Sequence, residues 1–179
     1  MPDLRRVPQA LGFTFTTAAG KPFRALLRPP PPPGPGYEPV VAPRRALLVG
    51  PEVGLPATGW IRDPSGLRFL HALWSNEGVV GQVTAQMHVL FAVTGDETWS
   101  RPSFTLEPIS GQRLASGSTV FGTTPTTREF FKRKNDALDV EEEVYRVVCL
   151  AALQVGDFLG DRRILKVESV LGLTTAEVF

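Results

Sequence analysis

Cysteine and histidine are scarce in this chain of 179 residues, which contains one cysteine, Cys149, and two histidines, His71 and His88. A single cysteine excludes a framework of disulfides within the chain, and this fits a reducing compartment. Three such residues also fall short of the four ligands of an ordinary structural zinc site built from Cys and His. The sequence therefore predicts no metal site, and it contains no cofactor-binding motif.

Long hydrophobic runs and an excess of charge are missing as well. No apolar run approaches the roughly 18 residues of a membrane span, and the first residues, Met1 to Arg6, lack the apolar core of a signal peptide. We therefore expect a protein that is soluble and intracellular at synthesis and has no membrane partner. The 19 Lys and Arg residues are balanced by 18 Asp and Glu residues, which leaves a net charge of +1. This balance argues against a function based on global attraction to nucleic acid.

Glycine and proline are abundant, with 17 residues of each. Because both residues interrupt long helices, we expect an all-β protein with at most one or two minor helical segments. Runs with period-2 alternation or β-branched residues occur at 11–17, 45–49, 67–74, 144–150 and 164–170. Turns are predicted at Asp63–Gly66 and Thr94–Glu97, and long loops at Pro29–Pro43 and Leu114–Asn135. Within the second of these loops, Leu114–Pro125 is either an exposed loop or an edge segment. The prolines from Pro29 to Pro33 form either a stiff loop between strands or a ligand for an aromatic groove.

The two halves of the chain show a weak internal repeat. Arg45–Val49 matches Arg146–Leu150, and Leu67–Trp74 matches Ile164–Val170. The hairpin that starts at Phe13 matches the segment from Phe91 to Pro108. The alternative is a chance similarity between two β-rich halves. A true repeat predicts two tandem small β-barrels or sandwiches, in domains 1–80 and 81–179, each with a thin core.

Few residues suggest catalysis, and we expect the protein not to be an enzyme. Cys149 lies in the most apolar run, where a free cysteine acts as a small buried hydrophobe. His71 and His88 are better explained as packing or hydrogen-bonding residues than as ligands. Asp157 and Asp161 flank a glycine in a tight turn, which is an ordinary place for aspartate. The sequence thus gives no catalytic, cofactor-binding or metal-binding residue.

A basic segment with two aromatic residues is the strongest candidate for a functional surface. Aromatic rings among cations are typical of single-strand nucleic-acid binding, but acidic residues nearby favour a protein contact. A further interpretation is a solvated loop or helical turn anchored by its two phenylalanines. The candidate subunit-contact residues are Arg128, Phe130, Phe131, Lys132, Arg133 and Lys134.

Two runs in the second half resemble small head–tail joining proteins of tailed bacteriophages, of the adaptor or stopper type. The first run is Phe104-Thr-Leu-Glu-Pro-Ile-Ser-Gly-Gln-Arg-Leu114, and the second is Val155-Gly-Asp-Phe-Leu-Gly-Asp-Arg-Arg-Ile-Leu-Lys-Val-Glu-Ser-Val170. In that family a strand precedes a long loop, and a Gly/Asp turn leads into the strand that ends the barrel. The chain departs from the pattern at Leu165, where an aromatic residue is expected, and in having an additional N-terminal half.

The resemblance implies a structural virion protein at the head–tail connector, or neck, that forms a ring of identical subunits around the DNA channel. Its partners would be copies of itself and portal, adaptor, tail or capsid proteins, with non-specific contact to packaged DNA. It would reside in the virion, and in the host cytoplasm during assembly. A capsid decoration protein or a baseplate or tail-hub protein is an alternative. A cytosolic binding module with a proline-rich ligand is an alternative from a different class.

Overall fold

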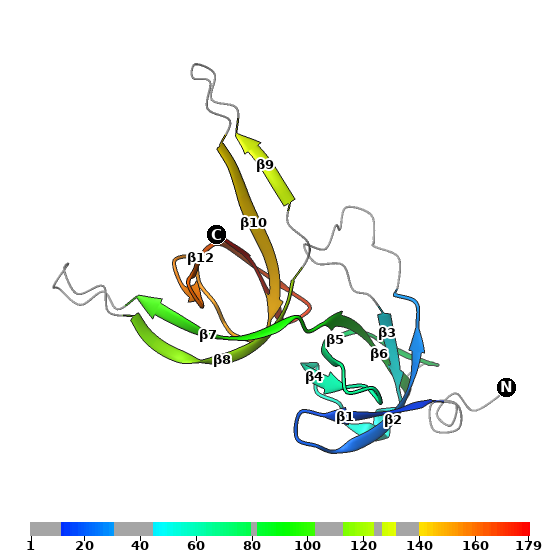
Figure 1. The fold of residues 1–179 in the computed structure, drawn as a ribbon. Coiled ribbons are helices and arrows are strands. Elements are labelled where there is room, and N and C mark those ends of the chain that lie inside the picture. The colour runs from blue at the N-terminus through cyan, green and yellow to red at the C-terminus, as the bar shows by residue number, and fades with distance from the viewer. Residues whose placement is uncertain (1–11, 31–44, 80–81, 103–112, 124–126, 132–139) are drawn as a thin grey trace.

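A computed structural model describes residues 12–30, 45–79, 82–102, 113–123, 127–131 and 140–179, and the fold is all-β (Figure 1). The first six strands close into an antiparallel barrel in the order β1-β2-β3-β6-β5-β4, with β4 pairing back to β1. Its strands are β1 (Phe13–Thr17), β2 (Pro22–Arg28), β3 (Arg45–Val49), β4 (Thr58–Arg62), β5 (Arg68–Val79) and β6 (Gln82–Ala92). The described helical structure is one 3-10 turn, η1 (Pro51–Val53).

A second antiparallel barrel follows in the order β7-β8-β10-β13-β12-β11, with β11 pairing back to β7. Its strands are β7 (Gly95–Pro102), β8 (Arg113–Thr123), β10 (Val140–Cys149), β11 (Phe158–Leu159), β12 (Arg162–Val170) and β13 (Leu173–Val178). One more strand, β9 (Thr127–Phe131), pairs with β10 outside this ring. The expectation of two tandem small barrels is confirmed.

The two barrels share one topology, which confirms the predicted repeat at the level of the fold. Replacing β1, β2, β3, β4, β5 and β6 by β7, β8, β10, β11, β12 and β13 turns the first strand order into the second. The matches of 45–49 with 146–150 and of 67–74 with 164–170 agree with this correspondence. The match proposed for the first hairpin does not, because Phe91 still belongs to β6 and the counterpart of β1–β2 is β7–β8.

Strand pairing also moves the boundary between the domains. Residue 80 lies within the β5–β6 hairpin, and β6 pairs with β3 and β5 of the first barrel. The first barrel therefore ends at Ala92 and the second begins at Gly95. The predicted turn at 94–97 and loop at 114–135 need correction too. Gly95 already starts β7, and much of the predicted loop forms β8 and β9, because β8 pairs with both β7 and β10.

Each barrel has its own apolar core, built from the inward-facing residues of its strands. In the first barrel the buried cluster consists of Phe15, Phe23, Ala25, Leu47, Val49, Leu55, Ile61, Phe69 and Leu90. In the second it consists of Phe121, Val147, Cys149, Leu153, Leu159, Ile164, Ala176 and Val178. Leu55 and Leu153 come from the loop after the third strand of each barrel, so the same connection helps to fill both cores.

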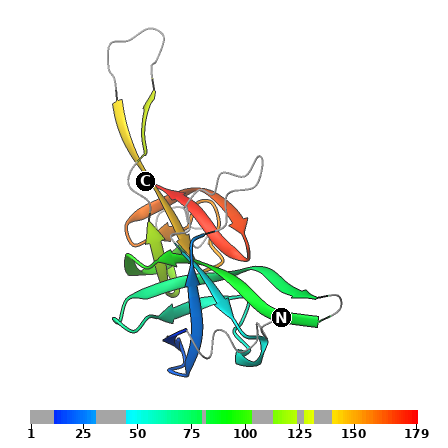
Figure 2. The same ribbon diagram turned by 90° about the vertical axis from the view of Figure 1, so that its right-hand side faces the viewer.

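A third apolar cluster lies between the two barrels. The outer face of β5 and β6 contributes Leu70, Ala72, Val89 and Phe91, and β10 and β13 contribute Val148 and Leu173. The turn between β12 and β13 also lies close to the first barrel, because a Cβ at Gly172 would be only 3.1 Å from Thr58 Cγ2 on β4. The two barrels thus lie side by side with a shared apolar contact (Figures 1 and 2).

Because Leu173 is buried between the barrels, the substitution Leu173→Ala should destabilise the protein. Leu173 is 1% exposed, so its truncation should lower the free energy of unfolding by about 2–5 kcal/mol, as is usual for a buried leucine. Urea unfolding followed by circular dichroism measures this change. Leu165→Ala is the matched control, since Leu165 is 46% exposed and its truncation should change the same free energy by less than about 0.5 kcal/mol. Equal effects of the two variants would contradict the described packing.

Candidate functional site

A two-stranded extension of the second barrel carries part of the predicted contact segment. We call β9 together with residues 140–144 of β10 the arm. Residues 140–144 pair with β9, whereas residues 145–149 pair with β13 and residues 147–149 pair with β8. β10 therefore belongs to the barrel at one end and to the arm at the other. The arm extends away from both barrels (Figures 1 and 2).

The structure places three of the six predicted contact residues in the arm. Arg128, Phe130 and Phe131 lie on β9, opposite Glu143, Glu141 and Val140 of β10. The backbone is extended here, which excludes the helical turn considered above for these three residues. Lys132, Arg133 and Lys134 lie outside the described residues, as does most of the Pro29–Pro43 loop. The segment 127–131 is thus a strand rather than a loop.

Each strand of the arm has a single partner strand among the described strands. β9 pairs with β10 on one side, and no other described strand pairs with it. Among the described strands, β9 is likewise the one strand that pairs with residues 140–144. Edge strands of this kind can accept a strand from another chain.

An ion pair fixes the loop between β10 and β11 to β7. Arg101 on β7 donates from Nε and Nη2 to the two carboxylate oxygens of Asp157, each at 2.9 Å, and the Gln154 backbone N–H donates to Asp157 at 2.8 Å. Burial opposes ionisation of Asp157, but these hydrogen bonds and the Arg101 charge outweigh it and lower the pKa of the carboxyl group. Asp157 was predicted as an ordinary turn residue, and its partner Arg101, 56 residues away, could not be identified from the sequence. The pair has a structural role in positioning this loop.

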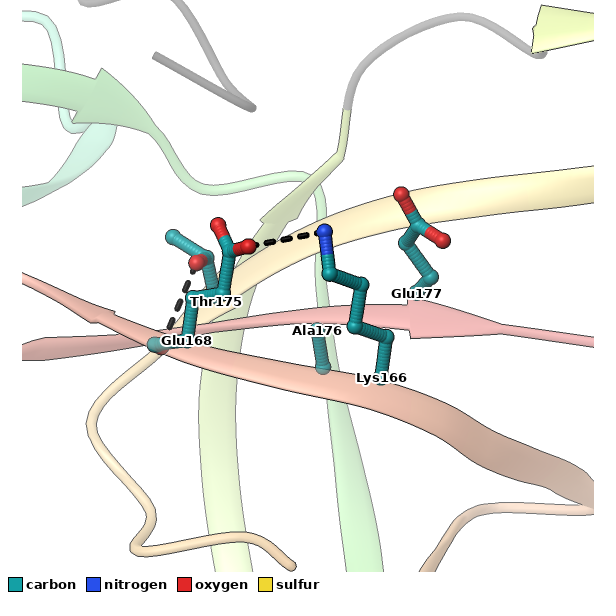
Figure 3. Close-up of a pocket in the computed structure, with 5 residues that line it drawn as sticks. All are labelled: Lys166, Glu168, Thr175, Ala176 and Glu177. Carbon is teal, nitrogen blue, oxygen red and sulfur yellow. Dashed lines mark hydrogen bonds and ion pairs between the residues drawn. The ribbon is translucent and has the colours of Figure 1, made fainter. Parts of the chain in front are cut away.

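A shallow charged hollow lies on the outer face of β12 and β13 (Figure 3). Lys166 Nζ lies 2.7 Å from Glu168 Oε1, and this hydrogen bond raises the pKa of Lys166. Thr175 Oγ1 donates to the Glu168 backbone oxygen at 3.2 Å. Glu177, which lines the same hollow, pairs with Arg146 of β10 at 3.4 Å. The hollow is a solvent-facing surface of alternating charge.

The two histidines form a buried pair inside the first barrel. His71 on β5 and His88 on β6 have their Nδ1 atoms 3.3 Å apart, and both rings are almost completely buried. One Nδ1 must donate and the other must accept. His88 Nε2 is buried without a hydrogen-bond partner. An unpaired acceptor is more common in protein interiors than an unpaired N–H, so we assign the proton of His88 to Nδ1, which then donates to His71.

Burial determines the ionisation of this pair. Desolvation, together with the nearby His88, lowers the pKa of His71 to about 3, and desolvation lowers the pKa of His88 to about 4. Both rings are therefore neutral near pH 7. The expectation that they pack and hydrogen-bond is confirmed, although the sequence did not show that they pair with each other.

Cys149 is also buried, as predicted. Burial raises the pKa of its thiol to about 11, so the thiol remains protonated near neutral pH and is not activated as a nucleophile. Among the described residues, no three His, Cys, Asp or Glu side chains gather in a way that could hold a metal ion. The same residues contain no helix of the length and hydropathy needed to cross a bilayer.

The histidine pair predicts that stability decreases in mild acid. The unfolded chain protonates its histidines near pH 6.5, while the folded chain resists protonation down to about pH 3 and 4. The free energy of unfolding should therefore be highest above pH 6.5 and fall as the pH decreases from there towards 4. Each histidine contributes a slope of up to about 1.4 kcal/mol per pH unit. Urea unfolding at several pH values measures this slope.

The second barrel supplies a control for this measurement. Strand registers place Ile164 and Ala176 where the first barrel has His71 and His88. The variant His71→Ile with His88→Ala should keep the barrel but lose most of the slope between about pH 5 and pH 6.5. The same slope in the variant and the unchanged chain would show that the histidines do not cause it.

Comparison with known proteins gives no assignment of family. No protein-family model, no curated protein and no solved structure matches the chain. The function therefore has to be argued from the residues and the fold.

Proposed function

We propose that this chain is a structural virion protein of a tailed bacteriophage, located at the head–tail connector, where copies of the chain form a ring through protein–protein contacts. The observation that carries the proposal is the arm, a two-stranded ribbon that leaves a closed barrel and includes the predicted contact residues Arg128, Phe130 and Phe131. The resemblance to head–tail joining proteins adds support. Its second run, 155–170, spans the end of a loop, β11 and all of β12.

A ribbon such as the arm gains stability from a partner. A two-stranded ribbon is marginally stable in water, because it buries little apolar surface. A partner that pairs with its edge or packs on its face supplies the missing interactions. The arm therefore suits the role of an intersubunit contact, while the two packed barrels supply a rigid body from which it extends.

The partners follow from this role. Copies of the chain are the first partner, and a portal, adaptor, tail or capsid protein is the second. In this proposal the protein acts mechanically rather than as an enzyme. A decoration or baseplate protein would also use surface contacts, so the position in the particle is an outcome of the experiment below. A proline-rich binding module would instead depend on Pro29–Pro33 and would not need the arm.

Phe130 and Phe131 provide the direct test. They occupy successive positions of β9, and successive positions belong to opposite faces of a strand. A subunit that packs on one face of the arm therefore meets only one of the two positions. The variants are Phe130→Ala and Phe131→Ala, made singly. One of the two should keep nearly the melting temperature of the unchanged chain but be incorporated less into particles. The measurement is the amount of each variant in purified particles after phage growth with the variant gene.

Phe13→Ala is the control for this experiment, since Phe13 is 56% exposed on β1 of the other barrel and should assemble normally. Labelling the chain within the particle distinguishes a neck position from a capsid or baseplate position. If both arm variants assemble normally, or if both unfold, the proposed contact is wrong.

The cations Lys132, Arg133 and Lys134 test the proposed contact with DNA. Changing all three to Gln should weaken binding of the purified chain to double-stranded DNA and reduce its dependence on salt, because fewer phosphates are neutralised. Filter binding at several salt concentrations measures both quantities. Unchanged affinity and salt dependence would exclude these residues from a DNA contact and would leave the protein contact unaffected.

A further inference from the structure

The shared topology allows the outer faces of the two barrels to be compared residue by residue. Leu47 and Val147 occupy equivalent inward positions on β3 and β10, since each lies in the core of its barrel and pairs with an inward residue of the last strand. The neighbouring outward positions then correspond as well. Following the strand registers across three strands gives one outer row in each barrel.

In the first barrel this row is apolar. It runs from Ala46 on β3 through Val89 on β6 to Ala72 on β5, and all three residues are completely buried. Ala72 and Val89 belong to the cluster that contacts Val148 and Leu173 of the second barrel. This face of the first barrel is therefore a docking face, and the second barrel covers it.

In the second barrel the equivalent row is charged. It runs from Arg146 on β10 through Glu177 on β13 to Lys166 on β12. The exposed fractions of these side chains are 34%, 26% and 57%, and no described part of the chain covers them as the second barrel covers the first. Leu165 and Phe179 lie next to this row and are exposed as well, at 46% and 56%. The row therefore brings charged side chains next to two exposed apolar ones.

Stability does not account for the charged row. Its ion pairs, Arg146–Glu177 and Lys166–Glu168, lie at the surface. Such pairs contribute about 0–1 kcal/mol to the free energy of unfolding. Lys and Glu are also depleted from strands, whereas the first barrel has Val at the centre of the same row. Charges on a sheet face do, however, oppose its burial against another apolar surface, because they would lose their hydration.

We propose that Arg146, Glu177 and Lys166 form an end cap, which prevents a second copy of the chain from docking on the second barrel. The face is equivalent to the one through which the first barrel docks, and the cap limits this mode of packing to two barrels. The outer face of the first barrel then accepts a partner barrel, and the equivalent face of the second barrel rejects one. The inference does not depend on the proposed function, since it rests on the strand registers and the exposure of the row.

The test replaces the charged row of the second barrel with the apolar residues that occupy the equivalent row of the first barrel. The variant Arg146→Ala, Glu177→Val and Lys166→Ala joins an apolar row to Leu165 and Phe179, and two such faces can bury each other around a twofold axis. The apparent mass of the variant, measured by light scattering on a gel-filtration column, should rise about twofold above that of the unchanged chain as the concentration increases. An apparent mass equal to that of the unchanged chain at every concentration would overturn the proposal.

A second triple variant separates the position of the charges from their loss. Arg28→Ala, Glu52→Val and Lys21→Ala makes the same three types of substitution at exposed positions of the first barrel. Its apparent mass should stay equal to that of the unchanged chain, and a rise like that of the cap variant would also overturn the proposal. If the cap variant does not fold, Glu177→Val with Lys166→Ala should show a weaker rise in mass. Loss of the fold in both cap variants would show that the row is needed for folding, and the end cap would be rejected.

Discussion

The apolar contact between the barrels is the interaction on which the rest of the structure depends. Each barrel is small, and a small β-domain buries a thin core. Leu70 and Phe91 on one side, with Val148 and Leu173 on the other, add a layer of buried surface that neither barrel could form alone. The strands that line this layer also line the two barrel cores, since β5, β6, β10 and β13 are buried on both faces where they meet. The contact therefore combines two thin cores into one three-layered apolar interior.

The two barrels share a topology but differ in detail. In the first barrel the interior holds the neutral His71–His88 pair, and the second barrel has Ile164 and Ala176 at the equivalent positions. A Cβ at Gly59 would lie 2.8 Å from His71 Nε2, so the backbone of β4 makes room for this ring. The second barrel inserts β9 after its second strand and fixes its loop with the Arg101–Asp157 pair. The two barrels thus differ in surface, in connections and in one polar pair, and they agree in strand order.

Much of the fold could be predicted from the sequence, because local signals there agree with the tertiary structure. Asp63 illustrates this: its carboxylate accepts hydrogen bonds from the backbone N–H groups of Ser65 and Leu67, as an aspartate at the start of a turn does. The strands at 45–49 and 164–170 follow from their β-branched and apolar residues. β8 could be predicted only as a loop or an edge segment, since its Gly, Ser and Thr residues are typical of loops and its strand conformation depends on pairing with β7 and β10. Of the candidate site, the sequence located Arg128, Phe130 and Phe131 but gave no sign that they lie on a ribbon beside 140–144, nor that the two histidines pair.

The continuity of β10 has a mechanical consequence. Residues 140–144 belong to the arm. In the wall of the second barrel, residues 145–149 pair with β13 and residues 147–149 also pair with β8. A pull on the arm along the strand would load these ladders in shear, so that many hydrogen bonds would have to break together rather than one after another. An arm that ended in a flexible linker would instead stretch the linker first. The chain therefore transmits tension from the tip of the arm directly into the barrel, and through Val148 into the contact with the other barrel.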